Sequence, residues 1–238
     1  SIHVCNMDPA ADFYKYESSM DIRDLITVED VMDELELGPN GGLVYCMEYL
    51  VENADWLAEQ INDFSDDYLL IDCPGQIELY VHLPVMQQFV QLLQNWGYTV
   101  CCVYMLDSQF MTDPSKFLSG TLMSLAAMAR LELPHVSVLT KIDLLSVTDQ
   151  EKLDDYIHPD SMSLLEEFDT HSVGNKHLRK LASATASLVE EYSLVSWLPL
   201  NGNQEDSVSF VLSQIDHCLQ FGEDEDVKDS MGKFDADD

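Results

Sequence analysis

Residues 68–76, Tyr-Leu-Leu-Ile-Asp-Cys-Pro-Gly-Gln, join an apolar run to a turn. The run that ends at Asp72 is typical of a β-strand covered on both faces. A carboxylate at a strand end can hold Mg²⁺ through a water, the Gly75 N–H can approach a γ-phosphate closely, and Gln76 can orient an attacking water. The alternative is an ordinary Asp-x-Pro-Gly turn, and this motif alone does not decide between the two.

Similar apolar runs alternate with segments of helical periodicity along the rest of the chain. Besides residues 68–72, the expected strands are Ile2–Met7, Tyr98–Leu106, Val136–Thr140 and Leu194–Leu200. The expected helices are Leu43–Ile61, Leu83–Trp96, Lys116–Leu131, Lys176–Tyr192 and Ser207–Leu219. This order predicts the α/β class, with a mostly parallel sheet flanked by helices. In such a sheet, ligands bind beyond the carboxyl ends of the strands.

A second motif, Thr140-Lys141-Ile142-Asp143, follows another expected strand. Asp143 could accept hydrogen bonds from the N1 and N2 donors of guanine, a pair of donors that adenine lacks. The Lys141 stem would lie over the face of the base, and the Thr140 hydroxyl would tie neighbouring loops together. The alternative is a strand followed by a helix-capping Asp. Two such motifs at one sheet edge favour a nucleotide site.

Two further segments carry candidate groups. Asp8, directly after the first expected strand, could reach a metal ion or the attacking water, although Asp-Pro is also a common turn cap. The glycine-rich segment 38–42, Gly-Pro-Asn-Gly-Gly, is expected as a loop before a helix. Such a loop could project Asn40 outward and bring N–H groups near an anion, or it could simply lead into the helix.

Composition excludes several classes of protein. The 238 residues include 11 Lys and Arg against 44 Asp and Glu, which gives a formal net charge of −33. Such a field repels phosphate backbones and acidic lipids, so we expect no direct nucleic-acid partner and no membrane partner. The longest apolar run, Val100–Leu106, is too short to span a bilayer. None of the six cysteines is spaced as Cys-x-x-Cys, and we interpret them as buried thiols of a reducing compartment.

Taken together, residues 38–40, 72–79 and 140–143 resemble the GPN-loop GTPases. Residues 41–49 and 107–110 are most similar to the eukaryotic GPN-loop GTPase 3 subgroup. The resemblance covers roughly residues 1–222. It implies a P-loop NTPase-like fold that binds and hydrolyses GTP with Mg²⁺, and a heterodimer with a paralogous GPN-loop GTPase or a homodimer. For the subgroup it also implies RNA polymerase II subunits as partners, in polymerase assembly and nuclear import, and a cytoplasmic location with shuttling to the nucleus.

The resemblance also assigns roles to individual residues. The implied catalytic residues are Gln76, Glu78, Asp8 and Asn40, the last acting across the dimer. The implied GTP-binding residues are Gly75, Thr140, Lys141, Asp143 and Ser196. The implied Mg²⁺ ligands are Asp72 and Asp8, partly through water.

The sequence departs from the family pattern in one respect. The motif Gly-x-x-x-x-Gly-Lys-[Ser/Thr] does not occur in it, so the fold is expected to lack the first strand and the Walker A loop. We therefore expect an N-terminally truncated domain over residues 1–222, with an unpaired strand edge, a helical insertion at about 149–174 and a disordered acidic tail at 223–238. Because the Walker A loop cradles the phosphates, such a chain should bind GTP poorly and not hydrolyse it.

Two other functions remain open from the sequence. The chain could be a non-catalytic interaction protein, a shortened isoform that acts through dimerisation. It could also be an ATPase of a related dimeric P-loop class, although Asp143 in its Thr-Lys-x-Asp setting favours guanine.

Overall fold

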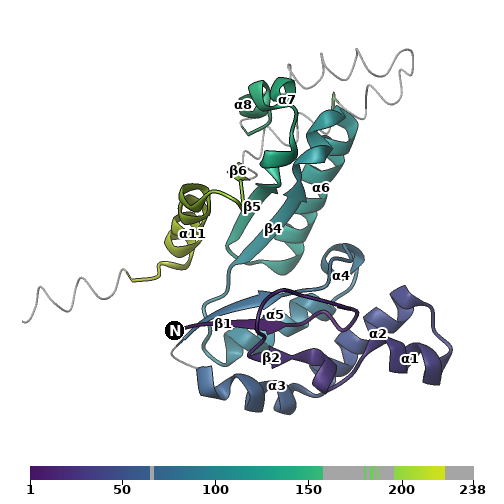
Figure 1. Cartoon of the computed structure of the whole chain (residues 1–238). Helices are drawn as coiled ribbons and strands as arrows, with labels where there is room; N and C mark the ends of the chain where they lie inside the picture. Colours follow the sequence, from purple (N-terminus) through teal and green to yellow (C-terminus); the bar gives the residue numbers. More distant parts are fainter. Residues whose placement is uncertain (65–66, 158–179, 181–182, 185–186, 188–195, 223–238) are drawn as a thin grey trace, which may run out of the picture. The chain divides into compact units, whose positions relative to one another are not determined.

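The computed structural model describes residues 1–64, 67–157, 180, 183–184, 187 and 196–222. The chain divides into two units, Ser1–Thr99 and Val100–Asp238 (Figure 1). Each unit has its own parallel sheet with helices packed against it, so the predicted α/β class is confirmed.

The sheet of the first unit has the strand order β2-β1-β3, and both pairings are parallel. Its strands are β1 (Ile2–Asn6), β2 (Met20–Asp21) and β3 (Tyr68–Asp72). The register places Asn6 beside Asp72, so β1 and β3 end at the same level. The segments that follow these two strands, which carry the predicted Asp8 and Gln76, therefore leave the sheet at one edge.

The helices of the first unit are α1 (Val28–Leu35), α2 (Pro39–Glu52), α3 (Ala54–Ile61), α4 (Glu78–Val81) and α5 (Val85–Asn95), with 3₁₀ turns η1 (Ile22–Asp24) and η2 (Asn62–Phe64). Helix α2 packs against α1, α3 and α5. A Cβ on Gly42 would lie 3.2 Å from a methyl group of Val28, so this glycine allows α1 and α2 to approach closely.

Two expectations about this helical region are wrong. The single helix expected at 43–61 is broken at Asn53, whose side-chain amide donates to the Tyr49 carbonyl at 2.7 Å and competes with the helical backbone. The glycine-rich segment 38–42 is not a loop with unusual backbone angles. Gly38 is the N-cap of α2, and Pro39 occupies its first position, where a missing N–H costs nothing.

The sheet of the second unit has the order β4-β5-β6, again parallel throughout. Its strands are β4 (Cys102–Asp107), β5 (His135–Thr140) and β6 (Trp197–Leu200). Its helices are α6 (Pro114–Leu131), α7 (Val147–Glu151), α8 (Leu153–Ile157) and α11 (Glu205–Leu219), with 3₁₀ turns η3 (Ser108–Thr112) and η4 (Ile142–Leu144). Asp107, Thr140 and Leu200 lie side by side at the carboxyl ends of the three strands.

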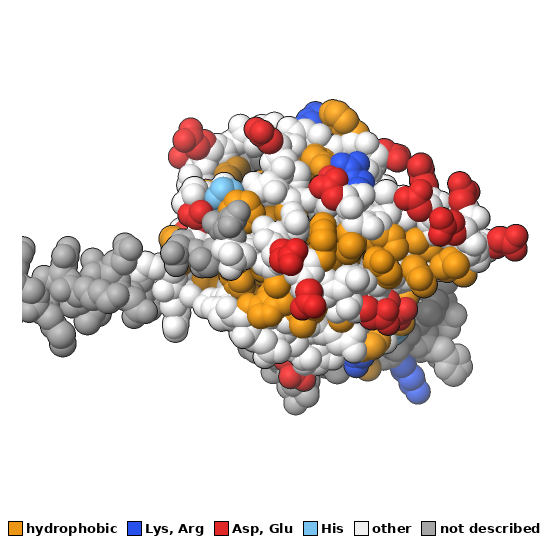
Figure 2. Space-filling model, turned by 90° about the horizontal axis from the view of Figure 1, so that it is seen from below, with side chains coloured by type: hydrophobic (Ala, Val, Ile, Leu, Met, Phe, Trp, Pro, Cys, Tyr) orange, Lys and Arg blue, Asp and Glu red, His pale blue; other side chains and the backbone are white. Residues whose placement is uncertain are grey.

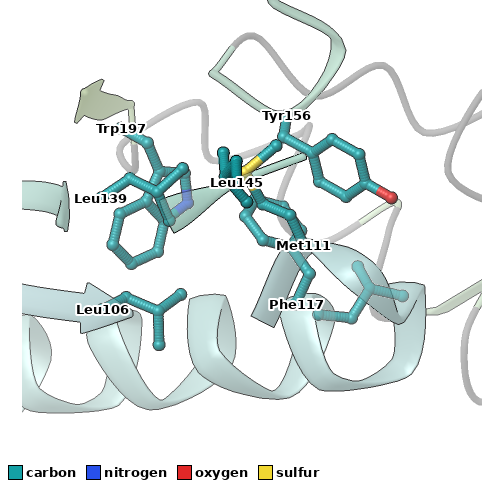
Figure 3. Close-up of a cluster of buried hydrophobic side chains, with 8 residues drawn as sticks. Leu106, Met111, Phe117, Leu139, Leu145, Tyr156 and Trp197 are labelled. Atoms are coloured by element: carbon teal, nitrogen blue, oxygen red, sulfur yellow. The ribbon is translucent and has the colours of Figure 1, made fainter. Parts of the chain in front are cut away.

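The core of the second unit gathers large side chains from the sheet, α6 and α8 (Figure 3). Trp197 and Phe117 are fully buried, and the Phe117 ring meets the Tyr156 ring edge-on, with centroids 4.8 Å apart. Such edge-to-face contacts add to the stabilisation from burial alone. This core fixes β6 and α8 against the strand that carries Thr140.

The strands form two separate three-stranded sheets where one sheet was expected. Among the described residues, β3 pairs only with β1 and β4 pairs only with β5, so each has one edge without a strand partner, as the sequence led us to expect. Helices α7 and α8 lie within residues 147–157 and overlap the start of the insertion expected at about 149–174. The rest of that insertion, most of the expected helix at 176–192 and the acidic tail lie outside the described residues.

The surface reflects the charge balance. On the face shown in Figure 2, acidic side chains are spread widely and Lys and Arg appear at few places. Within the part of the chain that the structure describes, no helix combines the length and the apolar character needed to cross a bilayer.

Candidate functional site

The predicted site residues fall into two groups, one in each unit. In the first unit, Asp72 ends β3, and its backbone carbonyl accepts a hydrogen bond from the Met7 N–H at 2.7 Å. Asp8 lies two residues beyond the end of β1, and one oxygen of its carboxylate accepts from the Ala10 N–H at 3.0 Å. The sheet therefore brings the two predicted metal ligands to one edge, and Asp8 also serves as the turn cap that the sequence left open.

A network of side chains surrounds Asp72 at this edge. The Tyr16 hydroxyl donates to Asp72 Oδ2 at 2.7 Å. Burial and this hydrogen bond to a carboxylate raise the pKa of Tyr16. Beside it, Arg23 forms a bidentate pair with Asp21, with its Nη2 atom 2.6 Å from Asp21 Oδ2. Burial tends to raise the pKa of Asp21, but hydrogen bonds from Arg23 and Tyr14 outweigh it and hold the pKa well below its usual range.

The turn after β3 has the form that the Pro-Gly-Gln motif predicted. The Tyr80 hydroxyl donates to the Pro74 carbonyl at 2.5 Å and fixes the turn. A Cβ on Gly75 would meet nothing within 4 Å, so the space beside this backbone is open. The Oε1 atom of Gln76 is buried without a hydrogen-bond partner. A buried amide oxygen without a donor costs free energy unless a ligand or water satisfies it, which fits a role in holding a water.

Glu78 and Asn40 are exposed residues at the starts of helices, and neither lies at the end of a strand of this sheet. Glu78 is exposed and opens α4, two residues after Gln76. Asn40 is exposed in the first turn of α2. In residues 1–64 and 67–157, no hydrogen bond joins the Asn40 side chain to Asp8, Asp72 or Gln76.

In the second unit, Lys141 leaves β5 in the left-handed region, with φ 61°. Its ammonium group donates to Asp107 Oδ2 at 2.8 Å, and this bond lowers the pKa of Asp107 and raises that of Lys141. The buried Ser108 hydroxyl donates to the Lys141 carbonyl at 2.9 Å. Ser108 thus ties the two loops together, the role that we expected of Thr140, whose hydroxyl has no partner in the described part of the second unit.

Asp143 is exposed within η4, and its Oδ2 atom accepts a hydrogen bond from Asn203 Nδ2 at 3.0 Å. Asn203 belongs to the loop that follows β6, where its own N–H donates to Asn201 Oδ1 at 3.0 Å. Ser196 lies before β6, at the opposite end of that strand from Leu200, the neighbour of Thr140. The structure therefore does not bring Ser196 to Thr140 and Asp143, and the loop at 201–204 occupies that position instead.

The donor set suits Mg²⁺ held jointly by protein, water and phosphate. Asp8 and Asp72 offer hard oxygen atoms at one edge, and magnesium sites use one or two carboxylates together with waters and substrate phosphates. No group of three or more His, Cys, Asp or Glu side chains that could hold a metal ion occurs among the described residues. The described residues therefore do not form a metal site in which the protein supplies every ligand.

Sequence reasoning missed four polar groups that the structure places beside predicted site residues. They are Tyr16, Arg23, Ser108 and Asn203. Ser108 and Asn203 each follow a strand, so their positions after a strand end could have indicated them. Tyr16 and Arg23 flank a two-residue strand that is too short to leave a pattern.

Comparisons with known proteins place the chain in a family. Residues 1–221 match a family model described as "Conserved hypothetical ATP binding protein". The chain is 50% identical over 230 residues to the GPN-loop GTPase 3 of Dictyostelium discoideum, covering 96% of this chain and 80% of that protein. It is 44% identical over 236 residues to the GPN-loop GTPase 3 of Saccharomyces cerevisiae, covering 98% and 87%.

A solved structure supports the same assignment. The crystal structure of a GTPase in apo form from Pyrococcus abyssi matches with a TM-score of 0.71 and 26% sequence identity, over 89% of this chain and 85% of that one. The α/β fold is thus similar to that of a P-loop GTPase. With its strand-end motifs and the identity to its relatives, the chain belongs to the GPN-loop GTPase family.

Proposed function

We propose that this chain is the guanine-nucleotide-binding part of a GTP-hydrolysing, dimeric switch protein. The observation that carries the proposal is the arrangement of Lys141 and Asp143 after β5. The Lys141 ammonium is held by Asp107, and the exposed carboxylate of Asp143 is held by Asn203. A carboxylate fixed in this way can accept both donors of the guanine edge, and the Lys141 stem would lie over the base.

The first unit carries the residues to which the family resemblance assigns phosphate and Mg²⁺ chemistry. Asp72 and Asp8 would hold Mg²⁺, partly through water, and a bound Mg²⁺ neutralises charge on the phosphate oxygens. The Gln76 amide oxygen would accept a hydrogen bond from the attacking water and orient it, with Glu78 as a second exposed acceptor nearby. The open space beside Gly75 leaves its N–H accessible to a phosphate oxygen.

The 238 residues do not contain the Gly-x-x-x-x-Gly-Lys motif that cradles phosphates in this class. We therefore propose that these residues alone bind GTP weakly. Calorimetric titration with GTP and Mg²⁺ tests this directly, and tight binding would contradict it. If the 238 residues act without that motif, the non-catalytic function through dimerisation becomes the better account.

Partners and location follow from the family resemblance alone. We propose a dimer, with a paralogous GPN-loop GTPase or a second copy, in which Asn40 reaches the partner's phosphate site. We further propose a role in RNA polymerase II assembly and nuclear import, and a cytoplasmic location with shuttling to the nucleus. Co-purification of a paralogue and of polymerase subunits from the source cells tests the partners.

The sharpest test of the nucleotide is the substitution Asp143→Asn in the 238-residue chain, at nucleotide concentrations high enough to measure weak binding. An amide cannot accept both guanine donors, so the preference should move from guanine toward xanthine nucleotides. GTP, XTP and ATP affinities are measured in parallel. The control is Asp149→Asn, which changes a carboxylate in the first turn of α7 that accepts a hydrogen bond from the N-cap residue Ser146. Unchanged GTP preference in Asp143→Asn, or wild-type preference for ATP, would overturn the guanine assignment.

A further inference from the structure

Asp72, one of the two proposed Mg²⁺ ligands, has a hydrogen-bond partner to which the proposed function assigns no role. The Tyr16 hydroxyl donates to Asp72 Oδ2 at 2.7 Å, a distance typical of a hydrogen bond to a charged acceptor. We propose that Tyr16 is a positioning residue for Mg²⁺, one that fixes the Asp72 carboxylate for the metal-bound water. This inference rests on the proposed function, because it concerns the same site.

At the end of β3, the backbone of Asp72 is held in place, whereas its side chain can rotate. Its backbone is fixed, since β3 pairs with β1 through residue 72 and the carbonyl accepts the Met7 N–H. The side chain is exposed, so burial does not hold its rotamer. A carboxylate has two oxygens, and Tyr16 occupies one of them. With that oxygen held, the other oxygen would have a defined position for binding a water on the metal.

Tyr16 is itself held by its neighbours. Its ring stacks on the ring of Tyr14, with centroids 4.5 Å apart and an interplanar angle of 14°. The Arg23 guanidinium lies 4.9 Å from the Tyr14 ring centroid, and its Nη2 atom donates to the Tyr14 hydroxyl at 2.7 Å. Arg23 is in turn fixed by Asp21 and by the Ala11 carbonyl, which accepts at 2.8 Å. The aromatic pair therefore forms a rigid support behind Asp72.

This support is anchored on every strand of the sheet. Asn6, at the end of β1, donates from Nδ2 to Asp21 Oδ1 at 2.9 Å, and Asp21 ends β2. Through Arg23 and the two tyrosines the contacts continue to Asp72 at the end of β3. Groups that orient a metal ligand in this way commonly change metal affinity 10–100-fold when they are removed.

The test is Tyr16→Phe, which removes the hydroxyl and keeps the stacked ring. GTP binding by the 238-residue chain is titrated with Mg²⁺ at GTP concentrations high enough to measure weak binding, and again in EDTA. We expect the Mg²⁺ concentration for half-maximal binding to rise about 10-fold, with the affinity for GTP in EDTA unchanged. The matched control is Tyr98→Phe, which removes a hydroxyl that donates to the Ile61 carbonyl at 3.1 Å and touches no site residue. Its Mg²⁺ dependence should equal that of the wild type.

A double variant separates positioning from simple loss of stability. In an Asp72→Asn background, Tyr16→Phe should add nothing further to the Mg²⁺ dependence, because the carboxylate that it positions is gone. Additive effects, or an equal loss of GTP binding with and without Mg²⁺, would overturn the inference and leave the proposed function intact. If the wild type itself shows no Mg²⁺-dependent GTP binding, the proposed function fails and this inference fails with it.

Discussion

His135 lies at the start of β5 in a small polar cluster inside the second unit. Its Nε2 atom is 3.1 Å from the Ser124 hydroxyl, which is itself 2.9 Å from that of Ser137. Its Nδ1 atom is buried without a partner, so a proton added there would find no acceptor. Burial lowers the pKa of His135 from 6.5 to about 4.

The first prediction follows from this shift. Because the unfolded chain takes up a proton near pH 6.5 and the folded chain only near pH 4, the free energy of unfolding should fall as the pH drops through this window. The loss should reach about 3 kcal/mol, at 1.36 kcal/mol per pKa unit. Denaturant unfolding of wild type and His135→Gln from pH 7 to pH 4 measures it.

The comparison isolates the histidine, because carboxylates titrate in both proteins alike. The glutamine can still bond to Ser124 and does not titrate, so the variant should lack the extra loss at acid pH. His82→Gln, at an exposed histidine of the first unit, is the control and should follow the wild type. Parallel pH profiles for His135→Gln and wild type would show that His135 is not the group responsible.

For single residues, the sequence motifs identified site residues that lie within the motif itself. They missed site residues that the fold brings in from distant parts of the sequence. Asp72 and Gln76 could be predicted because a strand and its turn place them locally. The position of Asn203 after a strand could have indicated this residue, but its contact with Asp143, 60 residues away in sequence, could not be predicted. Ser196 was assigned from the resemblance alone, and it lies before β6, at the opposite end of that strand from Leu200 and its neighbour Thr140.

At the scale of elements, helix α6 packs on β4 through Gly120. A Cβ at this position would lie 2.8 Å from a methyl group of Leu106, which is buried in the core of the second unit. We predict that Gly120→Ala destabilises the protein by about 1–3 kcal/mol, since overpacking outweighs the helix propensity that alanine gains. Thermal or denaturant unfolding measures this.

The control for that prediction is Gly41→Ala in α2. There a Cβ would lie 3.7 Å from Leu37 Cβ, an ordinary van der Waals contact. This variant should be neutral or more stable by up to about 1 kcal/mol, because alanine favours a helix over glycine. If Gly120→Ala were as stable as Gly41→Ala, the packing of α6 on β4 would be looser than described.

Several elements with a hydrophobic period were predicted well, but helix α1 at Val28–Leu35 was missed although it has such a period. The strand over residues 68–72 has the predicted bounds, and the helix predicted at 116–131 differs from α6 by two residues at its start. The break at Asn53 was missed because the apolar stripe runs through it, and a side-chain hydrogen bond to the Tyr49 carbonyl interrupts the helix. Strand β2 was missed because two residues carry no periodicity.

At the scale of the whole molecule, alternating strands and helices predicted parallel pairing, and every strand pairing observed is parallel. The division into two sheets was not predicted. Hydrophobic periodicity reports which residues form strands, whereas strand order depends on backbone hydrogen bonds between distant segments. The pattern of the sequence therefore fixes the class of fold more closely than the number of sheets.

The net charge of −33 has a consequence for the molecule as a whole. Like charges at this density repel one another in the compact state. Few cations offset them, since the chain has 11 Lys and Arg against 44 Asp and Glu, and ion pairs such as Arg23–Asp21 and Lys141–Asp107 therefore engage a minority of the carboxylates. Added salt screens these charges, since the Debye length shortens from about 10 Å at 0.1 M salt to about 3 Å at 1 M. Because most of the charges have the same sign, screening should remove more repulsion than attraction.

We accordingly predict that added salt stabilises the protein. Between 0.05 and 0.5 M NaCl the gain should be about 1 kcal/mol, which for a chain of this size raises Tm by about 2–4 °C. KCl should give the same increase at the same ionic strength, because screening depends on charge and not on the identity of the cation. A Tm that falls with salt would mean that the few ion pairs outweigh the repulsion. A response confined to one cation would indicate a specific binding site instead, and would direct attention to the carboxylates at the edge of the first sheet.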